Sequence, residues 1–384
     1  MKILLISMLV FILSSGIVSA QENYKTISKE DSSKYYFGVS PYEVIHVKEP
    51  SSRKKPKNII FMIGDGMGLA QIYSGLTANR GELNLNNFKT IGFQKTYSAD
   101  HYVTDSGAAG TALASGTKTY NGAIGVDRDT IAIPNIREKC EAMGKATSVV
   151  STSAVTHATP ASFVAHQASR NSYEAIAADF LQTDIDVFIG GGYKHFTQRA
   201  DGQDLTLELK KKGYQVLTDI DAVAKVSEGK LAGLLAPEHI KPMEEGRGNM
   251  LPLATKTALG ILDNDKDGFF IMIEGSQIDW GGHQNNTSYI VTEVLDFDRA
   301  IGEALAFAAK DGETLIVVTA DHETGGFAIN GGDLKKGNVQ GGFATGNHTG
   351  IMVPVFAFGP GADEFRGIYE NTDIPKKMLQ LISK

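Results

Sequence analysis

The chain has very little cysteine, with one residue, Cys140, in 384. A single thiol excludes an internal disulfide, although export from the cell would permit one. Cys140 follows Ile133 and Ile136 and precedes Met143, which places it on the apolar face of a predicted helix. We therefore expect a buried, unreactive thiol rather than a reactive or intermolecular one.

The chain also lacks an excess of positive charge. It carries 37 Lys and Arg residues against 44 Asp and Glu residues, a formal net charge of -7. Nucleic-acid-binding domains are usually strongly basic, so we expect no nucleic acid binding. With 42% hydrophobic residues, the chain is too apolar to be disordered, and its length suits one large globular domain or two smaller ones.

Hydrophobic runs long enough for a membrane helix, about 20 residues, are missing. The apolar run at residues 3–13 is shorter, follows Lys2 and precedes Val18-Ser19-Ala20, the small residues of a signal-peptidase site. We expect residues 1–20 to be a cleaved signal peptide and the protein to be periplasmic or secreted; a retained N-terminal anchor is the alternative. Residues 21–57 are polar and predict an N-terminal arm or linker.

Short apolar runs alternate with helical patterns from residue 58 onward, without an internal repeat. Most of the runs are too continuous to be half-exposed, as in a parallel sheet covered on both faces. We predict a doubly wound α/β catalytic domain over residues 58–384, with a mostly parallel central sheet and helices on both faces. The expected strands are 58–63, 146–150, 186–189, 269–274, 314–319 and 353–358.

Two segments of this domain are less regular. Residues 195–249 are polar and rich in Lys and Glu, and are either an ordinary α/β segment or an insertion at the rim. The Gly-rich residues 325–350 predict a loop excursion near the site, a small crown-type insertion.

The first strand runs into glycines in "NIIFMIGDGMG", as a dinucleotide-binding loop would. That fingerprint requires Gly or Ala at its last position, where this chain has Leu69. A carboxylate at Asp65 would also repel a pyrophosphate. Asp65 is better interpreted as a metal ligand, with the glycines allowing close approach; a helix N-cap is the alternative.

Acidic and histidine side chains follow three of the predicted strands. Because ligands bind beyond the carboxyl ends of such strands, we expect these groups to meet at one edge of the sheet. Clustered carboxylates repel one another, and divalent cations relieve that repulsion. Mixed Asp and His ligation suits zinc, whereas oxygen-only sites suit magnesium. The residues concerned are Asp65, Glu274, Asp279, His283, Asp321 and His322, with glycines between Asp279 and His283 that let the chain curl around an ion.

A nucleophile is predicted in "YVTDSGAAGTALASGTKT", residues 102–119. Ser106 precedes small, helix-tolerant residues, so it is expected at a helix start, where amides favour an anion. A serine needs a base or a metal to lose its proton, and no G-x-S-x-G elbow is present. Metal activation fits better, and a plain N-cap is the alternative.

The stretch "VTHATPASFVAHQASRN", residues 155–171, adds three polar candidates. Thr159 offers a hydroxyl for a hard cation, and Arg170 a planar fork for two phosphate oxygens. His157 could bind a metal or the substrate. A surface ion pair is the alternative for Arg170.

Together these segments resemble an alkaline phosphatase. The matching pieces are "GDGMG", "VTDSGAAGTA", "THATPASFVAH" with "SR", "IEGSQIDWGGH", "TADHETGG" and "GNHTG", in the family's order. The resemblance implies two Zn²⁺ sites and a third, usually Mg²⁺, site. The first zinc would use Asp279, His283 and His348; the second Asp65, Asp321, His322 and Ser106; the third Asp65, Thr159 and Glu274.

The resemblance also implies a reaction. Ser106, deprotonated on the second zinc, would attack phosphorus and form a phosphoserine, which water activated on the first zinc would hydrolyse. Arg170 would hold the non-bridging oxygens, and Asp105 would orient Arg170. The expected activity is metal-dependent hydrolysis of phosphate monoesters over a broad substrate range, by a homodimer.

Two positions depart from the enterobacterial pattern: this chain has His157 where that pattern has Asp, and Trp280 where it has Lys. Both residues are expected to bind substrate. The histidine makes magnesium less certain at the third site, and losing the lysine could weaken phosphate binding and speed turnover. Rival functions are phosphodiester or other ester hydrolysis in the same superfamily, and a secreted binding protein without turnover. Ser106 and Arg170 favour monoesters; no C/S-x-P-x-R sulfatase motif surrounds Ser106.

Overall fold

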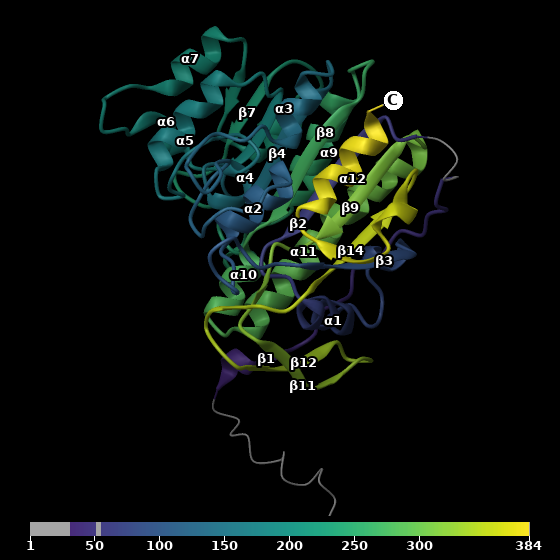
Figure 1. Ribbon diagram of the computed structural model, residues 1–384. Coiled ribbons are helices and arrows are strands. Elements are labelled where there is room, and N and C mark those ends of the chain that lie inside the picture. Colours follow the sequence, from purple (N-terminus) through teal and green to yellow (C-terminus); the bar gives the residue numbers. More distant parts are fainter. Residues whose placement is uncertain (1–30, 51–54, 384) are drawn as a thin grey trace, which may run out of the picture. The chain divides into compact units, whose positions relative to one another are not determined.

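The computed structural model describes residues 31–50 and 55–383. Its centre is a ten-stranded sheet, drawn in Figure 1, whose strands lie in the order β15-β3-β14-β9-β2-β8-β4-β5-β7-β6. The six predicted strands are all present, some longer than expected, and four further strands extend the two ends of the sheet. The strands are β2 Asn58–Gly64, β3 Thr90–Lys95, β4 Ala146–Ala154, β5 Val187–Gly191, β6 Gln215–Leu217, β7 Leu231–Leu234, β8 Phe269–Gly275, β9 Thr314–Thr319, β14 Val353–Phe358 and β15 Gly367–Glu370.

The sheet is parallel except at β14. Strand β2 pairs in parallel with β8 on one side and β9 on the other, whereas β14 pairs antiparallel with both β9 and β3. The prediction of a mostly parallel doubly wound sheet is therefore confirmed.

Strand β2 shows why its sequence is apolar throughout. Ile60 and Met62 belong to the core on one face of the sheet, and Ile59, Phe61 and Ile63 to the core on the other. All are fully buried, because a strand in the middle of a covered sheet has no solvent face. An alternating pattern would have left polar groups in one of the two cores.

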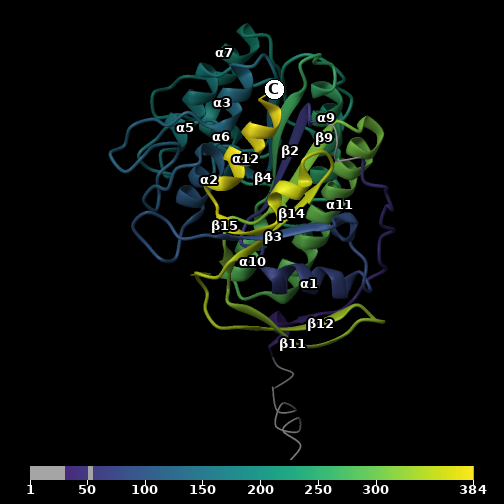
Figure 2. The ribbon, with the colours of Figure 1, turned by 45° about the vertical axis from the view of Figure 1, so that its right-hand side comes forward.

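Helices cover both faces (Figures 1 and 2). The first core includes side chains of α1 Leu69–Ala78, α8 Ile220–Val223, α9 Met250–Leu262, α10 Gln277–His283 and α11 Thr287–Asp311. The second includes side chains of α2 Ser106–Ser115, α3 Ile136–Glu141, α4 Ala158–Ala161, α5 Tyr173–Asp179, α6 Tyr193–Thr197, α7 Leu205–Lys211 and α12 Asp373–Ile382. Cys140 in α3 is fully buried, as predicted, and α11 buries an apolar stripe.

The Gly-rich residues 325–350 are not the loop that the sequence predicted. They form a hairpin of β11 Phe327–Asp333 and β12 Asn338–Phe343, which β1 Tyr35–Tyr36 extends to three strands. A second small ladder pairs β10 Glu323–Thr324 with β13 His348–Thr349. The glycines reflect crowding in this layer, since a Cβ on Gly341 would lie 2.3 Å from Thr287 Oγ1.

The polar residues 195–249 are an ordinary α/β segment, because they supply β6 and β7 of the main sheet. Residues 42–47 of the predicted arm are held by asparagine side chains: Asn79 accepts from Tyr42 N, Asn84 from Ile45 N and Asn87 from Val47 N. The predicted signal peptide, residues 1–20, lies outside the described residues. In the part of the chain that the structure describes, no helix is long and apolar enough to cross a bilayer.

Candidate active site

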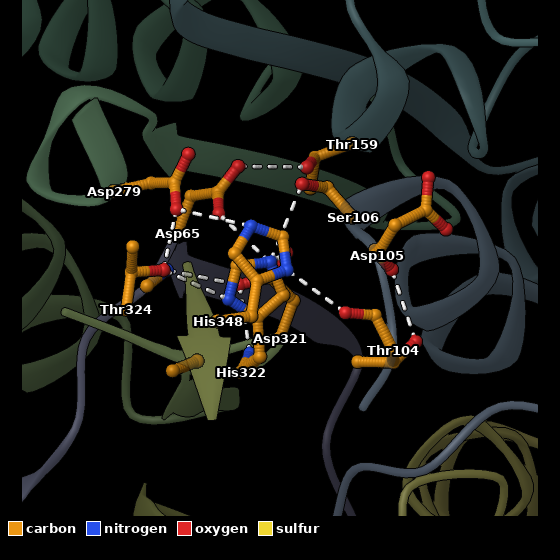
Figure 3. A network of polar contacts seen from close by, with 12 residues as sticks. Asp65, Thr104, Asp105, Ser106, Thr159, Asp279, Asp321, His322, Thr324 and His348 are labelled. Atoms are coloured by element: carbon orange, nitrogen blue, oxygen red, sulfur yellow. Dashed lines mark hydrogen bonds and ion pairs between the residues drawn. The ribbon is translucent and has the colours of Figure 1, made fainter. Parts of the chain in front are cut away.

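The carboxyl ends of the neighbouring strands β9, β2 and β8 bring the predicted ligands together. Figure 3 shows five of them: Asp65, Asp279, Asp321, His322 and His348. Asp65 follows β2, Glu274 lies near the end of β8, and Asp321 and His322 follow β9. Helix α10 adds Asp279 and His283, and the short strand β13 adds His348. Three groups of ligand atoms result, each with all its atoms within 4.8 Å of one another.

The first group contains Asp279, His283 and His348, the set that the family resemblance implied for one zinc. His283 Nε2 lies 3.3 Å from Asp279 Oδ2, and His348 Nε2 lies 3.5 Å from Asp279 Oδ1. The hydrogen bonds of the two Nδ1 atoms, to Gly346 O and Thr104 O at 2.8 Å each, aim the Nε2 atoms at the carboxylate.

The second group contains Asp65, Asp279 and His322. His322 Nε2 lies 3.5 Å from Asp65 Oδ1, 3.2 Å from Asp321 Oδ2 and 3.3 Å from Ser106 Oγ. The four residues predicted for the second zinc, Asp65, Asp321, His322 and Ser106, thus converge on one imidazole nitrogen. Asp279 also lies within this group, although the resemblance assigned Asp279 to the first zinc alone.

The third group contains Asp65, His157 and Glu274. Thr159, which was predicted here, donates its hydroxyl to Asp65 Oδ2 at 3.4 Å. Glu274 Oε2 accepts from Ser151 Oγ at 2.5 Å. A histidine therefore stands beside the predicted oxygen ligands, as the sequence led us to expect.

Burial gives this cluster its electrostatic character. Asp65, Glu274 and Asp321 are fully buried. Burial and then the charges of Asp321 and Asp279 raise the pKa of Asp65 well above its usual value, and burial raises that of Glu274 to about 7. Although burial opposes it, the hydrogen bond from His283 keeps the pKa of Asp279 low, while the same bond raises that of His283 to about 9.

Several of these atoms lack a hydrogen bond among the described residues. They are Asp65 Oδ1, Glu274 Oε1 and Asp321 Oδ2, three buried carboxylate oxygens. Buried polar atoms are nearly always bonded, and carboxylates this close repel one another. Divalent cations would satisfy both requirements, so the residues present fit bound metal ions.

The glycines around the cluster serve close packing rather than a loop around an ion. Asp279 and His283 lie one turn apart on a helix, so the predicted curl of the chain between them is wrong. A Cβ on Gly281 would lie 2.7 Å from Ile290 N of α11. Gly66 has φ +71°, and a Cβ there would lie 2.7 Å from Asp279 Cα, so it brings β2 against α10.

Ser106 is the first residue of α2, as predicted, but Asp105 is the N-cap. Asp105 Oδ1 accepts from the amides of Ala108 and Gly122 at 2.9 Å each. Its other oxygen, Oδ2, accepts from Arg170 Nη1 at 2.8 Å. One carboxylate therefore starts the nucleophile's helix and holds the guanidinium beside it.

The other side of the Arg170 guanidinium faces His157, whose Nε2 lies 3.3 Å from Nη2. Burial and then Arg170 lower the pKa of His157 to about 3, so this imidazole is neutral. The His157 ring meets that of Trp280 edge to face, with centroids 6.0 Å apart. The two predicted substrate-binding residues are thus neighbours.

Sequence reasoning missed His195 and His239, which follow β5 and β7. Their rings lie near Tyr173 and Trp280, with centroids 4.8 and 4.7 Å apart. The signal was available: the rule applied to the other strand ends would have found His195 after the predicted strand 186–189, and also His239, had the apolar "LAGLL" been recognised as a strand.

Comparison with known proteins places this arrangement in context. The sequence model of the alkaline phosphatase family matches residues 56–340. Alkaline phosphatase 4 of Bacillus subtilis is 34% identical, with 86% of this chain and 90% of the relative covered. Alkaline phosphatase of Escherichia coli is 30% identical, with 85% and 86% covered.

A solved structure is similar as well. The alkaline phosphatase from the Antarctic bacterium TAB5 superposes with a TM-score of 0.81 and is 47% identical, with 86% of this chain and 99% of that chain covered. A variant of that enzyme, 46% identical with the same coverage and TM-score, was solved with Mg bound in a site called M3.

Proposed function

The chain belongs to the alkaline phosphatase family, and from this premise we propose how its own residues hydrolyse phosphate monoesters. The protein is a metal-dependent phosphoric monoester hydrolase. The proposal concerns the metals, the nucleophile and the groups that hold the phosphoryl group.

We propose that the cluster holds two Zn²⁺ and one Mg²⁺. The mixed His and Asp donors of the first two groups suit zinc. Asp65 and Glu274 supply oxygens for the third, beside the Thr159 hydroxyl, which lies 3.4 Å from Asp65 Oδ2. The magnesium-bound variant of the TAB5 enzyme, in which aspartate replaces a histidine, supports a third ion; His157 in the third group of this chain suits magnesium less well than an oxygen ligand does. When bound, the ions stabilise negative charge on the attacking and departing oxygens and make a hydroxyl or water easier to deprotonate.

Ser106 is the proposed nucleophile. Its Oγ forms a bond to phosphorus while the bond from phosphorus to the ester oxygen breaks, and the alcohol leaves with a proton. Water then cleaves the bond between Oγ and phosphorus, which releases inorganic phosphate and returns the serine. Ser106 is the first residue of α2, where the positive end of the helix dipole favours the negative charge that develops in the reaction.

Arg170 is the proposed clamp on the non-bridging oxygens. Its Nη1 is engaged by Asp105, which leaves donors of the planar guanidinium for the substrate. Burial opposes charging, but the Asp105 carboxylate raises the pKa of Arg170, so the clamp is always cationic. His157 and Trp280 complete the wall beside it.

The proposal depends most on the surroundings of Ser106. Its Oγ lies 3.3 Å from His322 Nε2 in the carboxylate cluster. Ser106 also begins the helix whose N-cap, Asp105, binds Arg170. The test compares hydrolysis of p-nitrophenyl phosphate with that of bis-p-nitrophenyl phosphate at alkaline pH. Samples are the purified protein, a chelated sample, a sample restored with zinc and magnesium, and Ser106→Ala. Bound metal is counted by mass spectrometry of the intact protein and by elemental analysis.

Monoester turnover that is lost on chelation, returns with metal and is abolished in Ser106→Ala, with three ions counted, is the expected result. A preference for the diester would leave the metal ligands standing and refute the monoester assignment. Full activity of Ser106→Ala would refute the phosphoserine intermediate. An asparagine variant of Asp321 should lose metal from the second site and bind it normally at the first.

We further propose a broad range of phosphate monoesters, because the residues above grip the phosphoryl group. A homodimer and export are proposed from the family resemblance and from the sequence of residues 1–20. Light scattering of the purified protein and sequencing of its mature N-terminus test these two points.

A further inference from the structure

The polar edge of the sheet continues beyond the metal-ligand cluster. Next to β8 lie β4, β5 and β7, in that order, and each is followed by a histidine at its carboxyl end. These are His157, His195 and His239. His157 touches Arg170, and His195 is bonded through Nδ1 to Thr156 Oγ1 at 2.7 Å. His239 combines an Nδ1 bonded to the main chain with an Nε2 that has no hydrogen-bond partner among the described residues, on a side chain that is only partly buried.

The tautomer of His239 is fixed by the main chain. The amide N–H of Ala154 donates to His239 Nδ1 at 3.1 Å. A ring nitrogen that accepts carries no hydrogen, so the neutral imidazole has its proton on Nε2. Its Nε2–H is therefore a permanent donor.

The direction of this donor follows from the same bond. Ala154 is the last residue of β4, so Nδ1 points back at the strand end. Nε2, on the far side of the ring, points away from the sheet, into the region where ligands of such sheets bind. No described residue accepts from it, and the side chain is only partly buried. The donor is oriented and open.

The neighbours of His239 place it in the substrate site. Its ring lies 4.7 Å from that of Trp280 and 5.5 Å from that of His157, measured between centroids. Since His157 Nε2 in turn lies 3.3 Å from Arg170 Nη2, His239 stands one ring farther from the clamp than His157. Oxygens held directly by Arg170 belong to the phosphoryl group. An acceptor that meets His239 belongs to a more distant part of the substrate.

His239 is held rigidly by the residues on either side. Glu238 O accepts from Gly192 N at 2.5 Å, and the Glu238 carboxylate is paired with Lys194 Nζ and, at 3.1 Å, with His195 Nε2. Ile240 O accepts from Gln277 Nε2 at 2.8 Å, one turn before Trp280 on α10. A donor fixed before binding loses little entropy when the substrate arrives, which is how binding sites gain affinity.

We propose that His239 is a specificity-determining residue, whose Nε2–H donates to an oxygen of the alcohol part of the ester. The favoured substrates are then phosphate monoesters of polyols and other hydroxyl-bearing alcohols, over alkyl phosphates of the same length. This inference rests on the proposed function, since it assigns the alcohol side of the same site.

The experiment measures kcat/KM for glycerol 1-phosphate and for propyl phosphate, and takes their ratio within each protein. The ratio removes any change that affects the chemistry of both esters equally. His239→Asn keeps an acceptor for the Ala154 amide and drops the distal donor. His239→Phe keeps a ring against Trp280 and drops both nitrogens. His239→Gln is the matched rescue, because its amide reaches the position of Nε2.

The ratio of glycerol 1-phosphate to propyl phosphate should fall about fivefold in the asparagine and phenylalanine variants, the factor of one neutral hydrogen bond. It should stay within about twofold of the wild-type ratio in His239→Gln, and the inhibition constant of inorganic phosphate should change little in all three. An unchanged ratio in the asparagine or phenylalanine variant would overturn the proposal. So would a weaker phosphate inhibition constant without a change in ratio, which would assign the donor to the phosphoryl group.

Failure of this inference differs from failure of the proposed function. If the wild-type protein hydrolyses propyl phosphate and Ser106→Ala does not, the monoester assignment stands whatever the His239 variants show. Thermal unfolding of each variant shows that it is folded, and a variant that does not fold is replaced in the comparison by the other donor-free variant.

Discussion

Asp105 offers the sharpest test of the site, because one carboxylate carries two separable tasks. Oδ1 caps α2 through the amide of Ala108 and also accepts from the amide of Gly122, and Oδ2 holds Arg170. In Asp105→Asn the carbonyl oxygen can still cap the helix. The amide nitrogen then faces Arg170 Nη1, so that a donor opposes a donor where a charge-assisted hydrogen bond stood.

The magnitude follows from the exposure of the pair. Hydrogen bonds to charged groups contribute about 1.5 to 3 kcal/mol, and the side chains of Arg170 and Asp105 are 24% and 20% exposed. Solvent screening places the loss near the lower end, about 1.5 kcal/mol, or roughly tenfold in a binding constant. We therefore expect Asp105→Asn to raise the inhibition constant of inorganic phosphate roughly tenfold.

The control uses a double-mutant cycle on the phosphate inhibition constant. If Asp105 acts on phosphate only through the guanidinium, Asp105→Asn should change that constant less than about twofold in an Arg170→Met background. Thermal unfolding separates the second task. Both variants lose the bond to Arg170, but only Asp105→Ala also loses the cap, so it should lower the unfolding free energy by about 1 kcal/mol more than Asp105→Asn does.

Two results would refute this reasoning. An unchanged inhibition constant in Asp105→Asn would mean that Arg170 is positioned without its carboxylate partner. A tenfold change in both the wild-type and the Arg170→Met backgrounds would mean that Asp105 reaches phosphate by another route, such as the placement of Ser106 at the start of α2.

Three further predictions follow from the same geometry. The metal-free protein should lose stability as the pH rises from about 5 to 8, because the pKa of Glu274 is raised from 4.5 to about 7 and that of Asp65 is also raised. The protonated carboxyl groups stabilise the fold at low pH, and this stabilisation is lost as the pH rises through the pKa values of the folded protein. Thermal unfolding of chelated protein at each pH checks this, and a melting temperature that rises with pH would contradict it. Gly66→Ala should lower the free energy of unfolding by about 2 kcal/mol or more and weaken metal binding, because the added Cβ would clash with α10. Gly202→Ala is the control: Gly202 has the same φ of +71° but open space around it, so the loss should be about 1 kcal/mol. Chemical unfolding measures both losses, and equal values would contradict the steric argument. Trp280→Lys should tighten the inhibition constant of phosphate by restoring a cation beside the clamp, and no tightening in inhibition assays would count against that role.

The sequence alone determined the strand-forming runs, the polar residues at their ends and the start of α2. These are local properties. A continuous apolar run such as residues 58–63 requires burial on both faces, and an acid directly after it must lie at the sheet edge. Asp65, Glu274, Asp321 and His322 could therefore be placed together before their strands were ordered. Ser106 before a run of small residues predicted a helix start for the same local reason.

Only the tertiary structure decided which strands are neighbours and which ligands share an atom. Strand pairing is set by contacts between residues far apart in the chain, so the sequence could not show that β14 runs antiparallel or that Asp279 faces both His322 and His348. The local sequence around the glycines of α10 predicted a loop, whereas the structure places them in a helix that packs against α11. His239 had no local signal beyond a short apolar strand. The tautomer and the orientation of the His239 ring are set by a hydrogen bond from the amide of Ala154, 85 residues away in the chain.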